Sequence, residues 1–300
     1  MSLIECVPNF SVGTDGGELE AIVSAVARVD GVRVLDRSAD ADHQRAVVTF
    51  AGEARAVGEA AFLAVAEAAR RIDLREHVGV HPRMGATDVL PFVPLDPGAL
   101  PLAVELAHGV GARIADELAI PIYFYGEAAL LPERRALPDV RRGGFEALRG
   151  ESLAAAQRSP DRGPDRVHES AGAIAVGVRP FLLAYNVNLE STDLEAARAI
   201  AAEIREKGGG LPGVRALGFA LESASCVQVS TNVCDYQKSG ILDVFHAVER
   251  LARARGIEVR ESELVGLAPR AALDENTARA VRLRGFAPAR MILEELLHQP

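Results

Sequence analysis

The alternation of apolar and polar positions over the first 93 residues predicts strands and helices in turn. Strands are predicted at residues 4–7, 32–37, 46–50 and 89–93. Helices are predicted at residues 18–29 and 55–72. Thr14 or Asp15 is a candidate N-cap of the first helix, and Pro8 is expected to end the first strand. The resulting order, β-α-β-β-α-β, is that of a ferredoxin-like domain.

The same order of elements recurs in the last part of the chain. Strands are predicted at residues 181–187, 214–221, 226–231 and 257–261, and helices at residues 194–207 and 241–255. Thr192 or Asp193 caps the first of these helices. We therefore predict an α/β (α+β) protein of two ferredoxin-like subdomains, residues 1–177 with a linker and residues 178–300.

Further elements lie outside the two repeats. Helices are expected at residues 100–118, 271–281 and 289–296, and a strand at residues 120–125. Asp274 is a candidate N-cap of the helix at 271–281. Residues 131–169 show little strand signal and are rich in Arg, Pro and Gly. So long an irregular segment inside a compact protein is more often functional than neutral.

Composition narrows the class of protein. The chain has 300 residues, enough for two domains, and is 49% hydrophobic and 25% charged. Its net charge of −9 argues against nucleic acid as the main partner. No apolar run approaches the ~20 residues that span a bilayer, and the N-terminus lacks the basic region of a signal peptide. We expect a cytoplasmic protein without a membrane partner.

The segment 77–92, HVGVHPRMGATDVLPF, fits neither a helical nor a strand period until its last residues. Pro82 favours an extended backbone at His81. We expect His81 to project from a stiff loop, with Arg83 beside it and Asp88 at the start of the next strand. An imidazole that titrates near ~6.5 donates and accepts protons readily at neutral pH. His81 is therefore the predicted general acid and base.

A metal site at His77 and His81 is the rival interpretation. Histidines four residues apart form a zinc-binding face only on a helix, and Gly79 and Pro82 disfavour a helix there. The three cysteines are scattered and form no CxxC pair. We expect no metal.

Other polar groups cluster at turns and strand ends. The turn SADADHQR holds Asp40, Asp42, His43 and Arg45, a density greater than a hairpin needs. Its acids could hold a cationic amidine, and Arg45 could bind a carboxylate with two parallel hydrogen bonds. Asn9 follows the first strand, where either a turn or a ligand would favour an amide.

Later strand ends carry further candidates. Asn186 and Asn188 end one apolar strand and Asn232 ends another, as suits hydrogen bonding to a substrate. Glu127 could be a second proton carrier or a helix-start carboxylate. Between residues 133 and 166 the chain has eight Arg against six acids, either a solvated face or a basic rim for a carboxylate-bearing small molecule. No phosphate-binding glycine loop and no GxSxG motif is present.

Several motifs together resemble the glutamate formiminotransferase family. They are ECVPNFS at 5–11, DADHQRAVVTF at 40–50, HPRMGATDVLPF at 81–92, YFYGEAA at 123–129, and NVNL and QVSTN within 186–232. The resemblance covers nearly the whole chain, and its first and third motifs are highly specific. The chain resembles only the transferase part of the bifunctional animal enzyme.

The resemblance implies two ferredoxin-like subdomains with a folate held between them, and a homodimer. The family reaction moves a formimino group from N-formimino-L-glutamate to N5 of tetrahydrofolate, which is the co-substrate, in histidine degradation. The family's catalytic histidine falls on His81. Its folate-binding segment, PDFGP in relatives, falls on PDRGP here, that is, on Pro160, Asp161, Arg162, Gly163 and Pro164. Arg162 in place of the aromatic residue is a departure from that pattern.

The residues fit this chemistry. One histidine can take a proton from the attacking nitrogen and deliver one to the departing glutamate nitrogen. Carboxylates such as Asp40, Asp42 and Asp88 suit a tetrahedral intermediate that keeps positively charged nitrogen, and Arg45 and Arg83 suit the carboxylates of both substrates. Three alternatives stay open: formyl transfer from N-formylglutamate, metal-assisted hydrolysis of N-formiminoglutamate through His77, His81 and Asp88, and a non-catalytic binding module.

Overall fold

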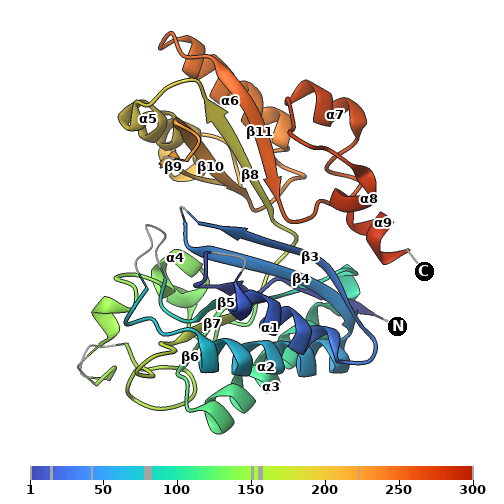
Figure 1. Cartoon of the computed structure of the whole chain (residues 1–300), viewed down its shortest axis with the longest axis vertical. Helices are drawn as coiled ribbons and strands as arrows, with labels where there is room; N and C mark the ends of the chain where they lie inside the picture. The colour runs from blue at the N-terminus through green and yellow to red at the C-terminus, as the bar shows by residue number, and fades with distance from the viewer. Residues whose placement is uncertain are drawn as a thin grey trace. The chain divides into compact units, whose positions relative to one another are not determined.

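The chain folds into two compact units, each with its own sheet. The structure is a computed structural model that describes residues 2–13, 16–41, 43–77, 83–149, 152–154, 158–221 and 223–298. Unit 1 is Met1–Arg179 and unit 2 is Pro180–Pro300. Both combine helices with a β-sheet (Figure 1), so the predicted mixed α/β class is confirmed.

Unit 1 is built on a seven-stranded sheet. Its strands are β1 (Leu3–Cys6), β2 (Asn9–Phe10), β3 (Val32–Asp40), β4 (Arg45–Glu53), β5 (Thr87–Pro94), β6 (Ile122–Gly126) and β7 (Ile174–Val178). Its α-helices in the described residues are α1 (Gly17–Ala27), α2 (Ala54–Arg71), α3 (Leu100–Leu118) and α4 (Leu137–Val140). The strand order is β1-β4-β2-β5-β7-β6, with β3 on the outer side of β4. The pairings of β7 with β5 and β6 are parallel, and the others are antiparallel.

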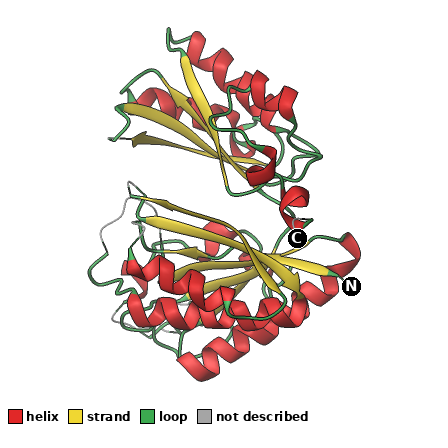
Figure 2. Cartoon of the chain, turned by 45° about the vertical axis from the view of Figure 1, so that its right-hand side comes forward, coloured by secondary structure: helices red, strands yellow, loops and turns green. Residues whose placement is uncertain are grey.

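Helices α1, α2 and α3 cover one face of this sheet (Figure 2). Strand β4 shows why, because Ala46, Val48 and Phe50 are buried in the core against these helices. Side chains alternate along a strand, so Arg45 and Thr49 lie on the opposite face. That opposite face carries the polar side chains of the candidate site.

The first strand ends before Pro8, as predicted, because β1 is Leu3–Cys6. Backbone hydrogen bonds nevertheless connect it to β2: the Val7 amide donates to the Pro91 carbonyl at 3.2 Å, and the Pro8 carbonyl accepts from the Val48 amide at 3.2 Å. Proline lacks an amide donor but keeps its carbonyl acceptor, so backbone hydrogen bonding continues from β1 into β2. Strand β7 was not predicted, although its five residues, IAVGV, are all buried, as is typical of a parallel strand covered on both faces.

Unit 2 has a four-stranded antiparallel sheet in the order β11-β8-β10-β9. Its strands are β8 (Leu183–Leu189), β9 (Val214–Leu221), β10 (Cys226–Val233) and β11 (Val259–Val265). Its α-helices in the described residues are α5 (Leu194–Ile204), α6 (Ile241–Arg253), α7 (Glu275–Ala280), α8 (Pro288–Met291) and α9 (Leu293–Leu297). Helices α5 and α6 cover the face that bears Tyr185, Val187 and Val229. The predicted β-α-β-β-α-β order is present, and the ferredoxin-like name stays a prediction.

Helix ends in unit 2 follow the predicted chemistry, with one exception. Asp193 caps α5 by accepting from the amides of Glu195 and Ala196, and Asp274 caps α7. The helix expected at residues 289–296 is instead divided at Ile292, which is buried and pairs with Ala268. Burying the Ile292 side chain in the core thus stabilises the fold more than a continuous helix would. Among the described residues, no helix is long and apolar enough to cross a membrane.

Candidate active site

A β-bulge places Asp88 on the polar face of the unit 1 sheet. Asn9 of β2 pairs with Val89 and Phe10 pairs with Thr87, so Asp88 is the extra residue of β5. Strict alternation would direct Asp88 toward the helices together with Leu90, which lies in their core. The bulge turns the carboxylate to the other face, a use of bulges that is common beside active sites.

Two arginines converge on this buried carboxylate. Arg45 Nη1 and Arg141 Nη2 each lie 2.8 Å from Asp88 Oδ2, and the Met84 amide donates to Oδ1 at 2.9 Å. The Asp88 side chain is fully buried, and the two arginine side chains are 14% and 15% exposed. Burial raises the pKa of Asp88, but Arg141, Arg45 and the hydrogen bonds outweigh it, so the pKa lies below its usual value. Asp88 is therefore an ionised group that orients two guanidiniums.

Asn9 extends this arrangement, which we call the Asp88 cluster: Asn9, Arg45, Asp88 and Arg141. Arg45 Nε donates to Asn9 Oδ1 at 3.0 Å, and Asn9 Nδ2 donates to the Val7 carbonyl at 2.8 Å. Three of its four members were predicted from the sequence. Arg141 was not singled out, because only the fold brings the segment after α4 onto β5.

Asp40 lies directly across from Arg45 in the β3–β4 pairing. Its Oδ1 accepts from the His43 amide at 2.8 Å and lies 3.0 Å from His43 Nδ1. The carboxylate thus orders the hairpin turn while standing next to the Asp88 cluster. Asp42, a further candidate, lies outside the described residues.

His77 and Arg83, the described residues on either side of 78–82, are both held by hydrogen bonds. His77 Nε2 lies 3.2 Å from the Gln44 carbonyl of the β3–β4 turn, and Arg83 Nη2 donates to the His77 carbonyl at 3.1 Å. Arg83 also pairs with Glu146 at 2.9 Å. Its guanidinium therefore joins three segments, a structural role that the sequence did not predict.

Residues 78–82, with His81 and Pro82 among them, lie outside the described residues, and so do the candidate N-caps Thr14 and Asp15. The catalytic role of His81 stays a prediction. His77 is half-buried, and desolvation is the main reason that its pKa is lowered. It is therefore neutral at pH 7. No group of three metal-ligating side chains occurs among the residues that the structure describes.

The predicted folate segment lies along the edge strand β6. Asp161 Oδ2 accepts from the Phe124 amide at 2.7 Å and Oδ1 pairs with Arg134 at 2.6 Å. The Arg162 carbonyl accepts from the Ile122 amide at 3.0 Å. Asp161 thus covers the polar edge of the sheet.

Other members of that segment face outward. Arg162, Gly163 and Pro164 are exposed, whereas Pro160 is half-buried. Gly163 has φ +90°, a conformation that favours glycine, and a Cβ there would lie 3.0 Å from the Ile120 carbonyl oxygen. Arg162, Gly163 and Pro164 are therefore the members of the segment that its fold leaves accessible to a ligand.

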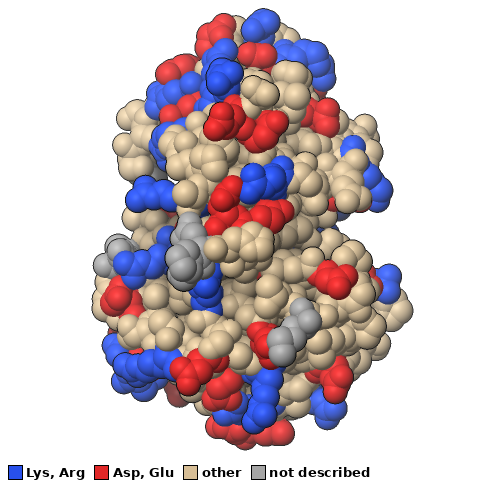
Figure 3. All heavy atoms as spheres, turned by 90° about the vertical axis from the view of Figure 1, so that its right-hand side faces the viewer, with Lys and Arg blue, Asp and Glu red and all other residues tan. Residues whose placement is uncertain are grey.

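The arginine-rich segment is largely used within unit 1. Arg134 pairs with Asp161, Arg141 with Asp88, and Arg158 donates to the carbonyls of Val140 and Arg142. Figure 3 shows a different face of the molecule, on which Lys and Arg side chains lie among Asp and Glu side chains. Several arginines of the predicted basic rim therefore bind other residues of unit 1.

Glu127 follows β6 and is exposed. Its amide donates to the Val178 carbonyl at 2.8 Å, and its carboxylate lies 3.9 Å from Arg135. Glu127 lies in a turn at which no helix begins, and its role as a second proton carrier stays a prediction. The structure places no other predicted site residue in contact with it among the described residues.

In unit 2, two of the three predicted asparagines belong to a larger polar network on the sheet face away from α5 and α6. We call it the amide cluster: Asn186, Asn188, Gln228, Glu261, Glu263 and Arg284. Asn186 and Asn188 are buried, whereas Asn232 is exposed on the same face. Alternation along β10 could have revealed Gln228, which stands between buried Val227 and Val229. Glu261 and Glu263 have no such signal, because they flank buried Ser262 in β11.

The chain matches two family descriptions. Residues 3–179 match "Formiminotransferase domain, N-terminal subdomain", and residues 184–282 match "Formiminotransferase domain". The chain belongs to the formiminotransferase family. The membership expected from the sequence motifs is thus confirmed, and the two matches cover the folded cores of units 1 and 2.

Curated members of the family align over most of this chain. It is 42% identical to the glutamate formimidoyltransferase of Thermoplasma acidophilum over 95% of this chain and 94% of that one. The glutamate formimidoyltransferase of Streptococcus pyogenes is 40% identical over 98% of both chains. The formimidoyltransferase-cyclodeaminase of Rattus norvegicus is 42% identical over 90% of this chain and 51% of its own length.

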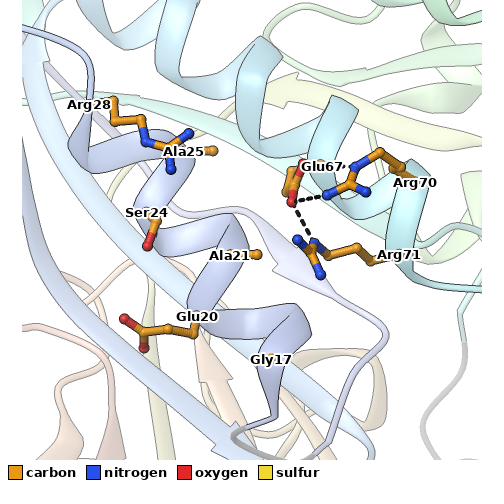
Figure 4. A pocket seen from close by; sticks show the side chains of 9 residues that line it. All are labelled: Gly17, Glu20, Ala21, Ser24, Ala25, Arg28, Glu67, Arg70 and Arg71. Carbon is orange, nitrogen blue, oxygen red and sulfur yellow. Dashed lines mark hydrogen bonds and ion pairs between the residues drawn. The ribbon is translucent and has the colours of Figure 1, made fainter.

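A groove on the helical side of unit 1 has no part in this arrangement. It has a volume of about 470 Å³ and lies between α1 and α2 (Figure 4). Its charged lining is largely self-paired, because Glu67 binds both Arg70 and Arg71. The predicted site residues of β2, β4 and β5, Asn9, Arg45 and Asp88, lie instead on the opposite face of the sheet.

Proposed function

We propose that this chain is a glutamate formimidoyltransferase, which moves the formimino group of N-formimino-L-glutamate to N5 of tetrahydrofolate. The observation that carries the proposal is the 42% identity to the Thermoplasma acidophilum enzyme over 95% of this chain and 94% of that one. Folate is the co-substrate that the family implies. The homodimer implied by the resemblance is proposed with it.

The reaction requires two proton movements. The lone pair of N5 attacks the amidine carbon, and N5 loses its proton. The bond from that carbon to the glutamate nitrogen then breaks, and this nitrogen receives a proton. We assign both transfers to His81, because a single imidazole can accept the first proton and deliver the second. Orienting the two substrates can supply a further ~7–11 kcal/mol of barrier reduction.

The Asp88 cluster is proposed to bind a substrate carboxylate. Its two guanidiniums share one carboxylate oxygen at 2.8 Å each, which fixes their directions. Both substrates carry carboxylates, and a guanidinium held by a buried partner is already ordered before the substrate arrives. Asp88 then acts by holding Arg45 and Arg141 rather than by moving protons.

The remaining candidates receive contact roles. Exposed Arg162, with Pro160, Gly163 and Pro164 around it, is proposed to contact the folate, and Asp161 to hold that segment on β6. Asn186, Asn188 and Asn232 are proposed to contact a substrate, and Arg83 and Glu127 are proposed to stabilise segments beside the site. No metal is needed for these steps.

Product balance tests the proposal directly. Purified protein is incubated with tetrahydrofolate and N-formimino-L-glutamate, and 5-formiminotetrahydrofolate and glutamate are quantified. We expect equal amounts of the two products and no change with a chelator. Glutamate release without tetrahydrofolate, or activity lost on chelation, would instead identify a hydrolase. Faster turnover with N-formyl-L-glutamate would show that the cargo is a formyl group.

A further inference from the structure

The amide cluster contains an acceptor that no described donor satisfies. Gln228 is 2% exposed, and its Nε2 donates to Asn188 Oδ1 at 3.0 Å and to Glu263 Oε1 at 2.9 Å. Its Oε1 is buried and has no hydrogen-bond partner among the described residues. A buried carbonyl without a donor is costly, so native proteins rarely keep one without a functional reason or a bound water.

The orientation of this amide follows from its neighbours. Exchanging the oxygen and nitrogen of Gln228 would place its oxygen against Asn188 Oδ1 and Glu263 Oε1, both of which are acceptors. The surrounding contacts also fix both carboxylates. Asn186 Nδ2 donates to Glu263 Oε1 at 3.0 Å, and Arg284 contacts Glu261 and Glu263 at 3.1 and 2.9 Å. The Gln228 oxygen is therefore held in place.

The charges of the cluster select the kind of ligand. Two carboxylates, of Glu261 and Glu263, face a single guanidinium, so the cluster has one negative charge in excess. A ligand carboxylate would be repelled there, whereas an N–H donor would be attracted. The unsatisfied group is itself an acceptor. Both features call for a group that donates N–H bonds.

We propose that the amide cluster binds a planar N–C–N group of a substrate and that Gln228 Oε1 accepts an N–H bond from it. This inference rests on the proposed function, because each substrate of that reaction carries such a group. In N-formimino-L-glutamate it is the formimino amidine, a strong base that is cationic at neutral pH. In tetrahydrofolate it is the neutral aminopyrimidinone end of the pterin.

The first test replaces Gln228 with methionine, which keeps the chain length and removes the carbonyl. We expect the KM for one of the two substrates to rise about 10-fold, the effect of one lost hydrogen bond of ~1.4 kcal/mol, with kcat within about 3-fold of wild type. Gln237→Met is the matched control, because Gln237 is exposed and outside the cluster. It should change neither constant.

A second variant identifies the substrate. The Arg284 side chain is 61% exposed, and Arg284→Met leaves the carboxylates uncompensated. If the amidine is the ligand, its KM should fall in this variant, since a cation meets more negative charge. If the pterin is the ligand, the KM for tetrahydrofolate should stay within about 2-fold of wild type.

Three results would overturn the inference. One is that folded Gln228→Met keeps both KM values within about 2-fold, as expected if a water satisfies the oxygen. Another is that only kcat falls. A third is that both KM values rise alike together with a lowered Tm. If Gln228→Met does not fold, Gln228→Asn, which withdraws the carbonyl by one methylene, must raise one KM at least 3-fold. Wild-type turnover is measured first, so failure of the proposed function is seen separately.

Discussion

Replacing Asp88 with asparagine should destabilise unit 1 more than any surface charge change. The side chain is fully buried and its Oδ2 lies 2.8 Å from the guanidiniums of both Arg45 and Arg141. The amide keeps the size of the group but removes the negative charge between two cations. Removing one partner of a buried ion pair costs about 3–5 kcal/mol. We expect a loss of that size in the free energy of unfolding.

Urea unfolding followed by circular dichroism at pH 7 measures this loss. Asp139→Asn is the matched control, because the Asp139 and Arg142 side chains are 51% and 79% exposed. Such surface pairs contribute about 0–1 kcal/mol. The folded state lowers the pKa of Asp88, so its contribution is complete above the unfolded pKa of about 4 and is lost as pH falls through the lower folded value. The gap between wild type and Asp88→Asn should therefore close in acid.

A double-mutant cycle tests the physical cause. With Arg141→Met in the background, Asp88→Asn leaves one guanidinium rather than two around the site. The cost of Asp88→Asn should then fall by at least about 1 kcal/mol, because residues in direct contact are not additive. Strict additivity, or a loss below about 1 kcal/mol for Asp88→Asn alone, would refute the electrostatic account of the Asp88 cluster.

Three further predictions follow from individual residues. His81→Ala should keep folate binding and lose at least ~100-fold in kcat, the low end of general acid–base effects; a near-wild-type rate contradicts its role. Burial raises the pKa of Glu5 to about 7 while Arg179 lowers it. Between pH 4.5 and 7, Glu5 is therefore protonated in the folded state and ionised in the unfolded state. The free energy of unfolding should fall by about 3 kcal/mol as pH rises across that range. Glu5→Gln should flatten this dependence in urea titrations at pH 5 and 8, and an unchanged slope contradicts it. Gly85→Ala should cost at least about 2 kcal/mol, because its Cβ would lie 2.2 Å from the Ala173 carbonyl oxygen. Gly109→Ala, with open space around it in α3, should be neutral or stabilising in the same measurement.

Periodicity predicted the elements whose burial is one-sided. The α3 helix and the β9 strand begin and end where the pattern placed them, at Leu100–Leu118 and Val214–Leu221. The N-caps Asp193 and Asp274 were also predicted, because a side-chain oxygen beside free amide groups is a local signal. Such features depend only on neighbours in sequence.

Strand β7 illustrates what periodicity misses. It is short, it follows a segment of little regular structure, and it shows no alternation because every side chain is buried. Its place between β5 and β6 depends on parallel pairing with strands far away in the sequence. A run of apolar residues alone does not distinguish such a strand from part of a buried helix.

The sequence indicates most residues of the Asp88 cluster, but only the fold shows how they are arranged. The sequence pointed to Asp88, Arg45 and Asn9 because polar groups at turns and strand ends exceed what the backbone needs. It could not give the direction of Asp88, since the alternation of β5 assigns that residue to the helix-facing side with Leu90. One extra residue opposite Asn9 reverses the assignment. The same bulge brings Asp88 within reach of Arg141, a residue that no local pattern connects to β5. Without the bulge, alternation would place the Asp88 carboxylate among the apolar side chains of the helix-facing core. With the bulge, the carboxylate lies on the polar face and holds the guanidiniums of Arg45 and Arg141 in place.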